Sequence, residues 1–356
     1  MARAIPVMAG QQLAGVGKIL PLRGSSTREA SALQANHLIH GYFDRRRAKL
    51  HFEFLIEDAA SHKMRPVSVE GEVFDASNAI SKAIDAGAHP FSSTNSTAIR
   101  AWSEGNLEAA TELDPTFVTV LRELAQDRSN KRRSTEAIEL YERSIRIDPQ
   151  EPTQYNGLGY AQFFTGDLSD ARKSFDQYMK FPGHEANALD SQGEVLFMAG
   201  QFKDAEQYFV KAHGQNPALL NGGDLLKAAY ARWLSGDRAG ADAIFQSYLD
   251  YRVKDGDKAL EGRKAIWEYS TGRPVESIAR LRPNLPEDLA VLERQYLQTP
   301  PAADGFIRTL YARALKKAGK NAEAAELTKR WPLPESGDQL LQAFVYPWFL
   351  ELKGIK

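Results

Sequence analysis

Several residues of types that can do chemistry are present, but their spacing supports little catalysis. The chain has no cysteine, which removes disulfides, thiolate nucleophiles and thiolate metal sites. His37 and His40 are the one close pair among the seven histidines. On a strand, a three-residue separation places them on opposite faces, so they cannot share a metal. The Walker A, dinucleotide-binding, zinc-protease and nucleophile-elbow motifs are missing. We therefore expect no enzymatic activity, no cofactor and no metal.

The basic run Arg45, Arg46 and Arg47, followed by Lys49, could meet phosphate or an acidic partner. The alternative, which we favour, is a solvated hairpin tip whose charges discourage edge-to-edge pairing. The net charge of the chain is −1, and its lysines and arginines are scattered. This pattern argues against a nucleic-acid partner. No run of 18 apolar residues exists, so we expect no membrane insertion. The absence of cysteine does not decide between cytoplasm and periplasm.

Small residues recur through the chain in pairs twelve positions apart, and successive pairs are 34, 34, 36, 36 and 47 residues apart. Two helices approach closely only where small side chains let their backbones meet, so each pair predicts one helical hairpin. A glycine between the two members marks five of the chain reversals. The pairs are Ala125/Ala137, Gly159/Ala171, Gly193/Ala205, Ala229/Ala241, Ala265/Ser277 and Ala312/Ala324, and the turn glycines are Gly166, Gly200, Gly236, Gly272 and Gly319.

The residues around these pairs resemble the tetratricopeptide repeat. The Ala-x3-aromatic signature occurs at Ala137, Ala171, Ala205 and Ala241 and weakens at Ser277, and Ala324 departs from it. The long last step predicts an insertion with a short extra helix over 284–297, bounded by prolines. The resemblance implies a mainly α solenoid of about six repeats over 118–337. Residues 338–356 carry an apolar stripe at helical spacing and are expected to cap it, with a dimerisation surface as the alternative.

Residues 1–95 predict a small α/β domain. His37–Phe43 and Lys49–Glu57 have strand composition, with a turn over Asp44–Ala48. A third strand over Pro66–Val73 precedes a helix capped by Asp75 or Ser77 and running to Ile84. A linking helix is expected within 96–117, where Trp102 suggests a rigid junction.

This α/β pattern resembles the TolB-like amino-terminal domain, found in bacteria ahead of tetratricopeptide repeats. The resemblance rests on Ala35–Asp44 and Leu50–Asp58, and Gly157–Pro217 and Tyr346–Ile355 resemble the same composite family. Residues 1–34 are shorter than the family's first strand–helix half. Either that fold is trimmed, or the natural chain begins before Met1.

The first helix of each repeat lines the concave face of such a superhelix. Equivalent inner positions carry aromatic residues in four consecutive repeats, as binding hot spots favour. Packing between repeats would explain the same residues equally well. Two carboxylates on this face would select a partner by charge. The candidate groove residues are Tyr160, Phe163, Asp190, Glu194, Phe197, Tyr230, Trp233 and Tyr269.

These observations predict a non-catalytic scaffold, monomeric or weakly dimeric, that binds a peptide or helix of a protein partner in its concave groove. The alternative is a sensory or regulatory protein, in which the α/β unit binds a small ligand and the repeats relay this to an effector module. The lysine and asparagine clamp of chaperone-binding repeats is missing at the matching positions. Capture of an acidic C-terminal tail in the groove is therefore not expected.

Overall fold

The computed structural model describes residues 5, 8, 9, 12, 36–46, 49–86, 92–334 and 338–355. Two compact units divide the chain, Met1–Leu124 and Ala125–Lys356. The division falls inside helix α6 (Val118–Asn130), so this helix contributes to both units. Ala35 and Arg47, named above from the sequence, lie outside the described residues.

The first unit contains a three-stranded antiparallel sheet in the order β1 (His37–Arg46), β2 (Lys49–Asp58), β3 (Met64–Gly71). The predicted five-residue turn over Asp44–Ala48 is wrong, because Asp44 pairs with His51 and Arg46 with Lys49. Strand pairing uses backbone groups, so the polar side chains of this segment do not end the ladder. The arginine run therefore begins within a strand rather than at a loop tip.

Helix α3 (Val73–Ile84) follows the sheet directly. Its end agrees with the prediction, but its start does not, because the helix begins at Val73, which we had placed in the third strand. The N-cap residue is Glu72, whose backbone N–H donates to Asp75 at 2.8 Å. Asp75 is therefore the third residue of the helix, and its carboxylate accepts the free backbone N–H of the N-cap residue. It is not the N-cap residue itself. Buried residues of α3, including Ile80, share a core with Phe52 of β2.

The segment predicted as one linking helix forms two short helices, α4 (Ser96–Ser103) and α5 (Leu107–Leu113). The turn between them uses Gly105, whose φ is +82°. Asn95 and Asn106 cap the two helices with their side chains, which explains why the second helix starts where it does. Trp102 packs edge-to-face on Phe117, with 5.8 Å between ring centroids.

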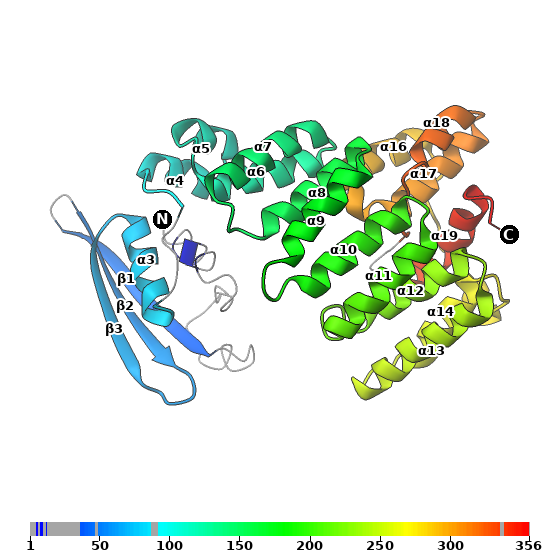
Figure 1. Cartoon of the computed structure of the whole chain (residues 1–356), viewed down its shortest axis with the longest axis horizontal. Coiled ribbons are helices and arrows are strands. Elements are labelled where there is room, and N and C mark those ends of the chain that lie inside the picture. The colour runs from blue at the N-terminus through cyan, green and yellow to red at the C-terminus, as the bar shows by residue number, and fades with distance from the viewer. Residues whose placement is uncertain are drawn as a thin grey trace. The chain divides into compact units, whose positions relative to one another are not determined.

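The second unit is a tetratricopeptide-like array of antiparallel helical hairpins (Figure 1). The predicted turn glycines all have positive φ, from +76° to +110°, and each follows the first helix of its hairpin. The prolines at 149 and 217 follow the ends of second helices. Four full hairpins pair α6 with α7 (Ser134–Ile147), α8 (Thr153–Thr165) with α9 (Leu168–Met179), α10 (Glu185–Met198) with α11 (Phe202–Gln215), and α12 (Gly223–Leu234) with α13 (Arg238–Lys254).

The array becomes irregular where the sequence signature weakens. Helix α14 (Leu260–Ser270) pairs with a single turn, α15 (Glu276–Ala279), before a proline-containing stretch. The predicted extra helix is present as α16 (Leu289–Gln298). The chain then continues through η1 (Pro301–Ala303), α17 (Gly305–Lys317), α18 (Asn321–Leu327) and α19 (Gln339–Leu352).

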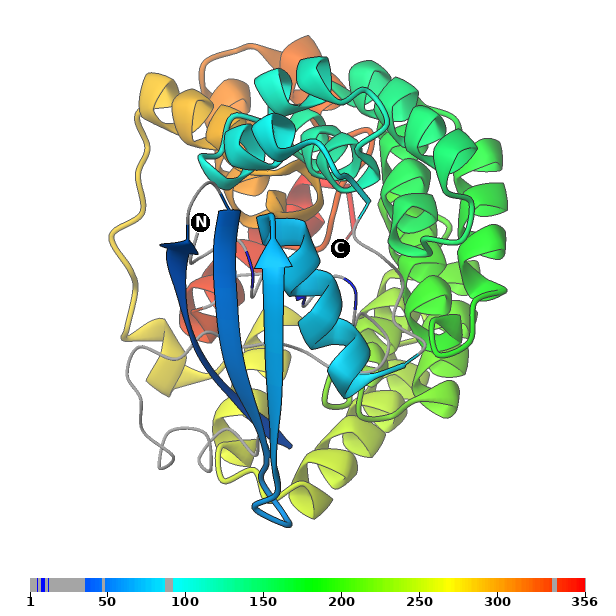
Figure 2. The same ribbon diagram turned by 90° about the vertical axis from the view of Figure 1, so that its left-hand side faces the viewer.

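Within the second unit, the chain folds back on itself. Helix α19 packs against α14 and α17, and its Tyr346 and Phe349 belong to the same buried cluster as residues of α10 and α12. Figure 2 shows α19, in red, on the inner side of the curve made by the green and yellow hairpins. The predicted cap is therefore a helix that also lies along the inner face of the array.

Candidate functional site

The inner helices of the array are held close to their partners by glycine. A Cβ atom added at Gly159 would lie 2.6 Å from Phe175, and one added at Gly193 would lie 2.6 Å from Phe209. Each phenylalanine comes from the second helix of the same hairpin. The glycine and the aromatic ring thus fill one space together, which fixes the direction in which α8 and α10 present their remaining side chains.

Charged side chains from three inner helices form a network on this face. The Tyr160 hydroxyl donates to Glu194 Oε2 at 2.5 Å. Lys227 Nζ donates to Asp190 at 2.8 and 3.0 Å and to Glu194 Oε1 at 2.5 Å. The sequence analysis named three of these four residues but missed Lys227. Nothing in the local sequence distinguishes Lys227 from the other lysines. Its partners Asp190 and Glu194 are more than thirty residues away in the chain, so the ion pairs could not be predicted.

Asp224 completes the network and is fully buried. Neither of its side-chain oxygens has a hydrogen-bond partner in the structure. Burial raises the pKa of Asp190 to about 8, and the negative charge of Glu194 adds to this against the opposing charge of Lys227. Burial raises the pKa of Asp224 as well. Both carboxyl groups therefore hold a proton more tightly than an ordinary aspartate does.

Glu194 behaves differently from its neighbours. Burial disfavours its charged form, but the charge and hydrogen bond of Lys227 outweigh burial and lower its pKa. Burial and the charge of Glu194 together raise the pKa of Tyr160 well above its usual value. A carboxyl group with a raised pKa can serve acid–base chemistry only where a substrate reaches it. Asp190 is 6% exposed and Asp224 is fully buried, so this network acts by joining α10 to α12.

The predicted groove aromatics are divided among three clusters, and most of them are buried. Phe197, Tyr230 and Trp233 share one cluster, Tyr160 and Phe163 a second, and Tyr269 packs on a third. Tyr160 and Tyr269 are half-buried. The exposed fractions of the other four are 2% for Phe163, 2% for Tyr230, 4% for Phe197 and 5% for Trp233.

The C-terminal part of the second unit covers these aromatic side chains. Tyr346 lies against Tyr230, with centroids 4.6 Å apart, and Phe344 lies edge-on against Tyr269 at 5.4 Å. The Trp331 backbone N–H donates to the Met198 carbonyl at 3.2 Å. Residues 331–334 and 338–352 therefore occupy the inner face much as a bound peptide would.

Several polar groups on this covering segment lack ideal partners. The Trp331 Nε1 and Tyr346 hydroxyl groups are buried and have no hydrogen-bond partner in the structure. Burial lowers the pKa of Lys353 to about 8, and the positive charge of Arg308 adds to the shift. Each buried unsatisfied group costs ~1–3 kcal/mol, so this contact is less stable than its apolar area alone would make it.

A second buried network, absent from the sequence analysis, ties the first hairpin to α17. Arg132 Nη2 donates to Asp304 Oδ2 at 2.6 Å, and Arg308 donates to both oxygens of the same carboxylate at 2.7 Å. Arg132 also stacks over Tyr296, 3.9 Å from the ring centroid. It occupies the turn position that is glycine in the later hairpins and has φ of +61°. An arginine in place of the turn glycine was the one feature of the sequence that could have pointed to this network.

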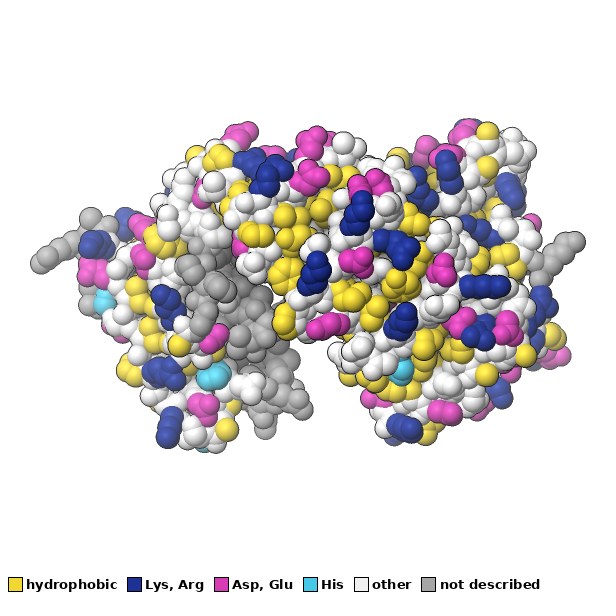
Figure 3. Space-filling view, in the orientation of Figure 1, with side chains coloured by type: hydrophobic (Ala, Val, Ile, Leu, Met, Phe, Trp, Pro, Cys, Tyr) yellow, Lys and Arg dark blue, Asp and Glu magenta, His cyan; other side chains and the backbone are white. Residues whose placement is uncertain are grey.

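The surface charge, the helix lengths and the possible metal ligands indicate no further candidate site among the described residues. On the face drawn in Figure 3, basic and acidic side chains of the second unit are interspersed, without a large patch of one sign. Among the described residues, no helix is both long and apolar enough to cross a membrane. The same part of the chain brings together no three side chains able to hold a metal ion.

No protein-family model and no curated protein matches this chain. Among solved structures, the chain is similar to two described as crystal structures of MamA. Each match has 19% identity and a TM-score of 0.38 and covers 45% of this chain, with 96% and 90% of the respective MamA chains covered. A structure described as Naa15/Naa10 bound to HypK-THB matches with 14% identity and a TM-score of 0.33, over 73% of this chain and 38% of that one. The similarity concerns the fold alone.

Proposed function

We propose that this protein is a non-catalytic scaffold that binds a segment of a partner protein on the concave face of its repeats. The observation that carries the proposal is that residues 331–334 and 338–352, called here the internal segment, lie on that face with aromatic side chains among those of the inner helices. A surface that accommodates this segment is suited to a partner helix of similar chemistry, with aromatic anchors on one side.

In this proposal the partner competes with the chain's own C-terminal segment. The anchoring surface comprises the eight groove residues predicted from the sequence, and its polar end contains Asp190, Glu194 and Lys227. The unsatisfied Trp331 and Tyr346 groups favour exchange, because leaving the face lets both groups reach water. A partner that offers hydrogen-bond acceptors at these points would bind more tightly than the internal segment does.

A labelled synthetic peptide with the sequence of residues 338–355 tests this proposal. Fluorescence anisotropy would follow its binding to the intact chain and to a Trp331→Ala variant. We expect the variant to bind the peptide more tightly, because removing the Trp331 ring weakens the internal segment's hold on the face. A third variant, Trp331→Ala with Phe197→Ala, should lose that gain. Circular dichroism must show that all three proteins keep their helices. If folded Trp331→Ala binds no more peptide than the wild type, the inner face is not an exchangeable site.

We also propose that the α/β unit is related to the TolB-like domain and that the protein is bacterial. Three antiparallel strands followed by α3 support this relation.

We propose in addition that the chain is divided into 1–95, 96–117, 118–337 and 338–356, in which the second segment contains α4 and α5. A chain expressed without residues 1–95 should keep the thermal transition of the repeats if this division is right. We further propose that the protein is monomeric or weakly dimeric, which light scattering coupled to size exclusion measures directly.

A further inference from the structure

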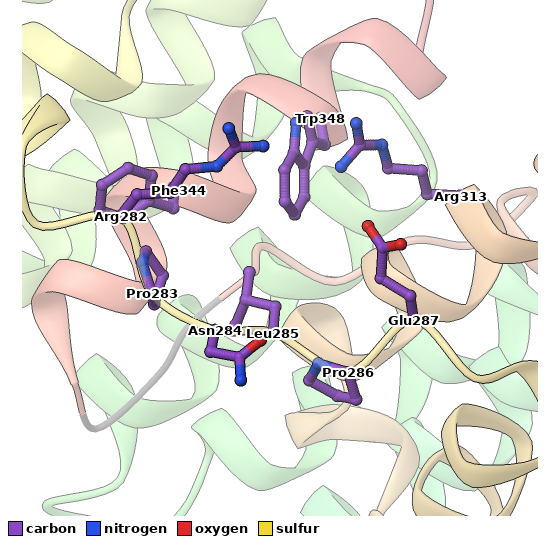
Figure 4. A pocket seen from close by; sticks show the side chains of 9 residues that line it. All are labelled: Arg282, Pro283, Asn284, Leu285, Pro286, Glu287, Arg313, Phe344 and Trp348. Atoms are coloured by element: carbon purple, nitrogen blue, oxygen red, sulfur yellow. The ribbon is translucent and has the colours of Figure 1, made fainter.

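A pocket of about 500 Å³ opens on the second unit, and of the concave-face contacts described above it shares only Phe344. Its walls come from three places: the stretch between α15 and α16, the helix α17, and one side of α19. Figure 4 shows the nine lining residues. They are Arg282, Pro283, Asn284, Leu285, Pro286, Glu287, Arg313, Phe344 and Trp348.

The floor of the pocket is apolar and well supported. Phe344 and Trp348 are one helical turn apart on α19, so they project from the same side of the helix. Phe344 is buried against Tyr269, and Trp348 packs with the cluster around Leu310 and Tyr311. Pro283 and Pro286 keep the opposite wall free of helix, because a proline cannot continue a helix, and residues 282–288 have no regular secondary structure.

The charges around this floor are mainly positive. Arg313 lies over the Trp348 ring, 3.7 Å from its centroid. In Figure 4, the guanidinium groups of Arg282 and Arg313 lie on either side of the indole. Among the described residues, neither arginine has an ion pair with a carboxylate. Glu287 lines the pocket too, but its charge is offset by Lys317 at 3.1 Å.

These features select one kind of occupant. Two guanidinium groups beside an exposed cavity attract a carboxylate, and their planar forks match its two oxygens. The indole, Phe344 and Leu285 offer apolar surface within the same cavity, which a simple inorganic anion cannot cover. An acidic side chain next to an apolar one meets both requirements at once.

We propose that this pocket binds an acidic segment of a partner protein, in which a carboxylate side chain is flanked by apolar residues. Arg282 and Arg313 hold the carboxylate, and Trp348 and Phe344 hold the apolar neighbour. This is a second binding site, and it does not depend on the concave face being exchangeable.

The test uses the intact protein and two probes, acetyl-Leu-Glu-Phe-amide and acetyl-Leu-Gln-Phe-amide. The chain has five tryptophans, so the indole N–H signal of Trp348 can be assigned in a ¹⁵N spectrum with a Trp348→Phe variant. We expect the Glu peptide to shift this signal in a saturable way and the Gln peptide to bind about fivefold more weakly, as loss of a partly exposed ion pair implies.

Substitutions that remove a positive charge and one that removes a negative charge should change the affinity in opposite directions. This distinguishes an electrostatic effect from structural damage. Arg282→Gln and Arg313→Gln should each weaken binding of the Glu peptide about fivefold. Glu287→Gln should strengthen it about twofold, because it removes a repelling carboxylate. Arg280→Gln is the matched control, since Arg280 is 79% exposed, pairs with Glu276 and does not line the pocket.

Three results would overturn the proposal. The Trp348 signal could stay unchanged at saturating Glu peptide. The Glu and Gln peptides could bind equally, which would make the pocket purely apolar. Inorganic phosphate alone could shift Trp348 with the same affinity as the peptide, which would make it a simple anion site.

Discussion

Single residues in this protein depart from the repeat pattern where they take part in long-range contacts. Arg132 is the clearest case, because it adopts φ of +61° at a turn where later hairpins have glycine. A side chain in this conformation costs ~1–2 kcal/mol relative to glycine. Its ion pair with the fully buried Asp304 offsets that cost.

Two substitutions at Arg132 separate these effects. Arg132→Gly should destabilise the protein by ~1–3 kcal/mol through loss of the contact with Asp304, which keeps Arg308 as its remaining partner. Arg132→Ala should be less stable than Arg132→Gly by a further ~1 kcal/mol, since alanine retains the strained conformation without the ion pair. Urea denaturation measures both. Arg133→Ala, at the exposed neighbour, should stay within about 0.5 kcal/mol of the wild type. Equal stability of the Gly and Ala variants would contradict the strain argument.

Asp190 and Lys353 should give the stability of the second unit a minimum near pH 8. The pKa of Asp190 is raised from 3.8 to about 8, so the folded state binds this proton more tightly than the unfolded state. Stability therefore falls as the pH rises from about 4 to about 8. The pKa of Lys353 is lowered from 10.5 to about 8, so its burial destabilises the protonated form. That cost disappears as the pH rises from about 8 to 10.5.

The measurement is the free energy of unfolding in urea at intervals from pH 5 to pH 10. Asp190→Asn should reduce the fall in the free energy of unfolding between pH 5 and pH 8. Some of the fall should remain, because Asp224 contributes to it as well. Lys353→Met should flatten the ascending part above pH 8. A wild-type profile that rises between pH 5 and pH 8 would contradict the raised pKa of Asp190.

At the scale of helices, glycine decides how closely two helices pack. Gly159→Ala places a methyl group against Phe175 and should destabilise the protein by ~1–3 kcal/mol through overpacking. Gly262→Ala is the matched control, because a Cβ at this position of α14 meets no atom within 4 Å. It should raise stability by ~0.5–1 kcal/mol through the better helix propensity of alanine. Thermal unfolding followed by circular dichroism distinguishes the two signs, and destabilisation by both changes would argue against the packing explanation.

At the scale of the whole second unit, α19 belongs to both proposed sites. One side of it covers Tyr230 on the inner face, and the other carries Trp348 into the pocket. A ligand that needs α19 in place therefore opposes a ligand that displaces it. Saturating acetyl-Leu-Glu-Phe-amide should weaken binding of a 338–355 peptide with Trp348→Ala to the Trp331→Ala variant severalfold, because this peptide replaces α19 without restoring the indole of the pocket. By linkage, the altered 338–355 peptide should weaken binding of the acidic peptide by the same factor. Independent binding of the two peptides would show that α19 stays in place when the inner face is occupied.

The sequence by itself determined the parts of this protein that depend on short separations. A small residue, a turn glycine seven positions later and a second small residue after twelve specify one hairpin, whatever the rest of the chain does. The same offsets occur at Ala98, Gly105 and Ala110, which form the α4–α5 hairpin that we had predicted as one helix. This pair was missed because it lies only 27 residues before Ala125, outside the regular step.

Only the tertiary structure decided what lies on the inner face. The aromatic residues there were predicted from their position in the repeat. Phe197, Tyr230 and Trp233, however, share a buried cluster with Trp331 and Tyr346, which lie about 100 or more residues further along the chain. Helix-forming patterns record which side of a helix is apolar, not which distant segment will cover it. Whether the groove is open or covered depends on the total apolar area that is buried across the whole array. The spacing of residues within one helix does not specify that area.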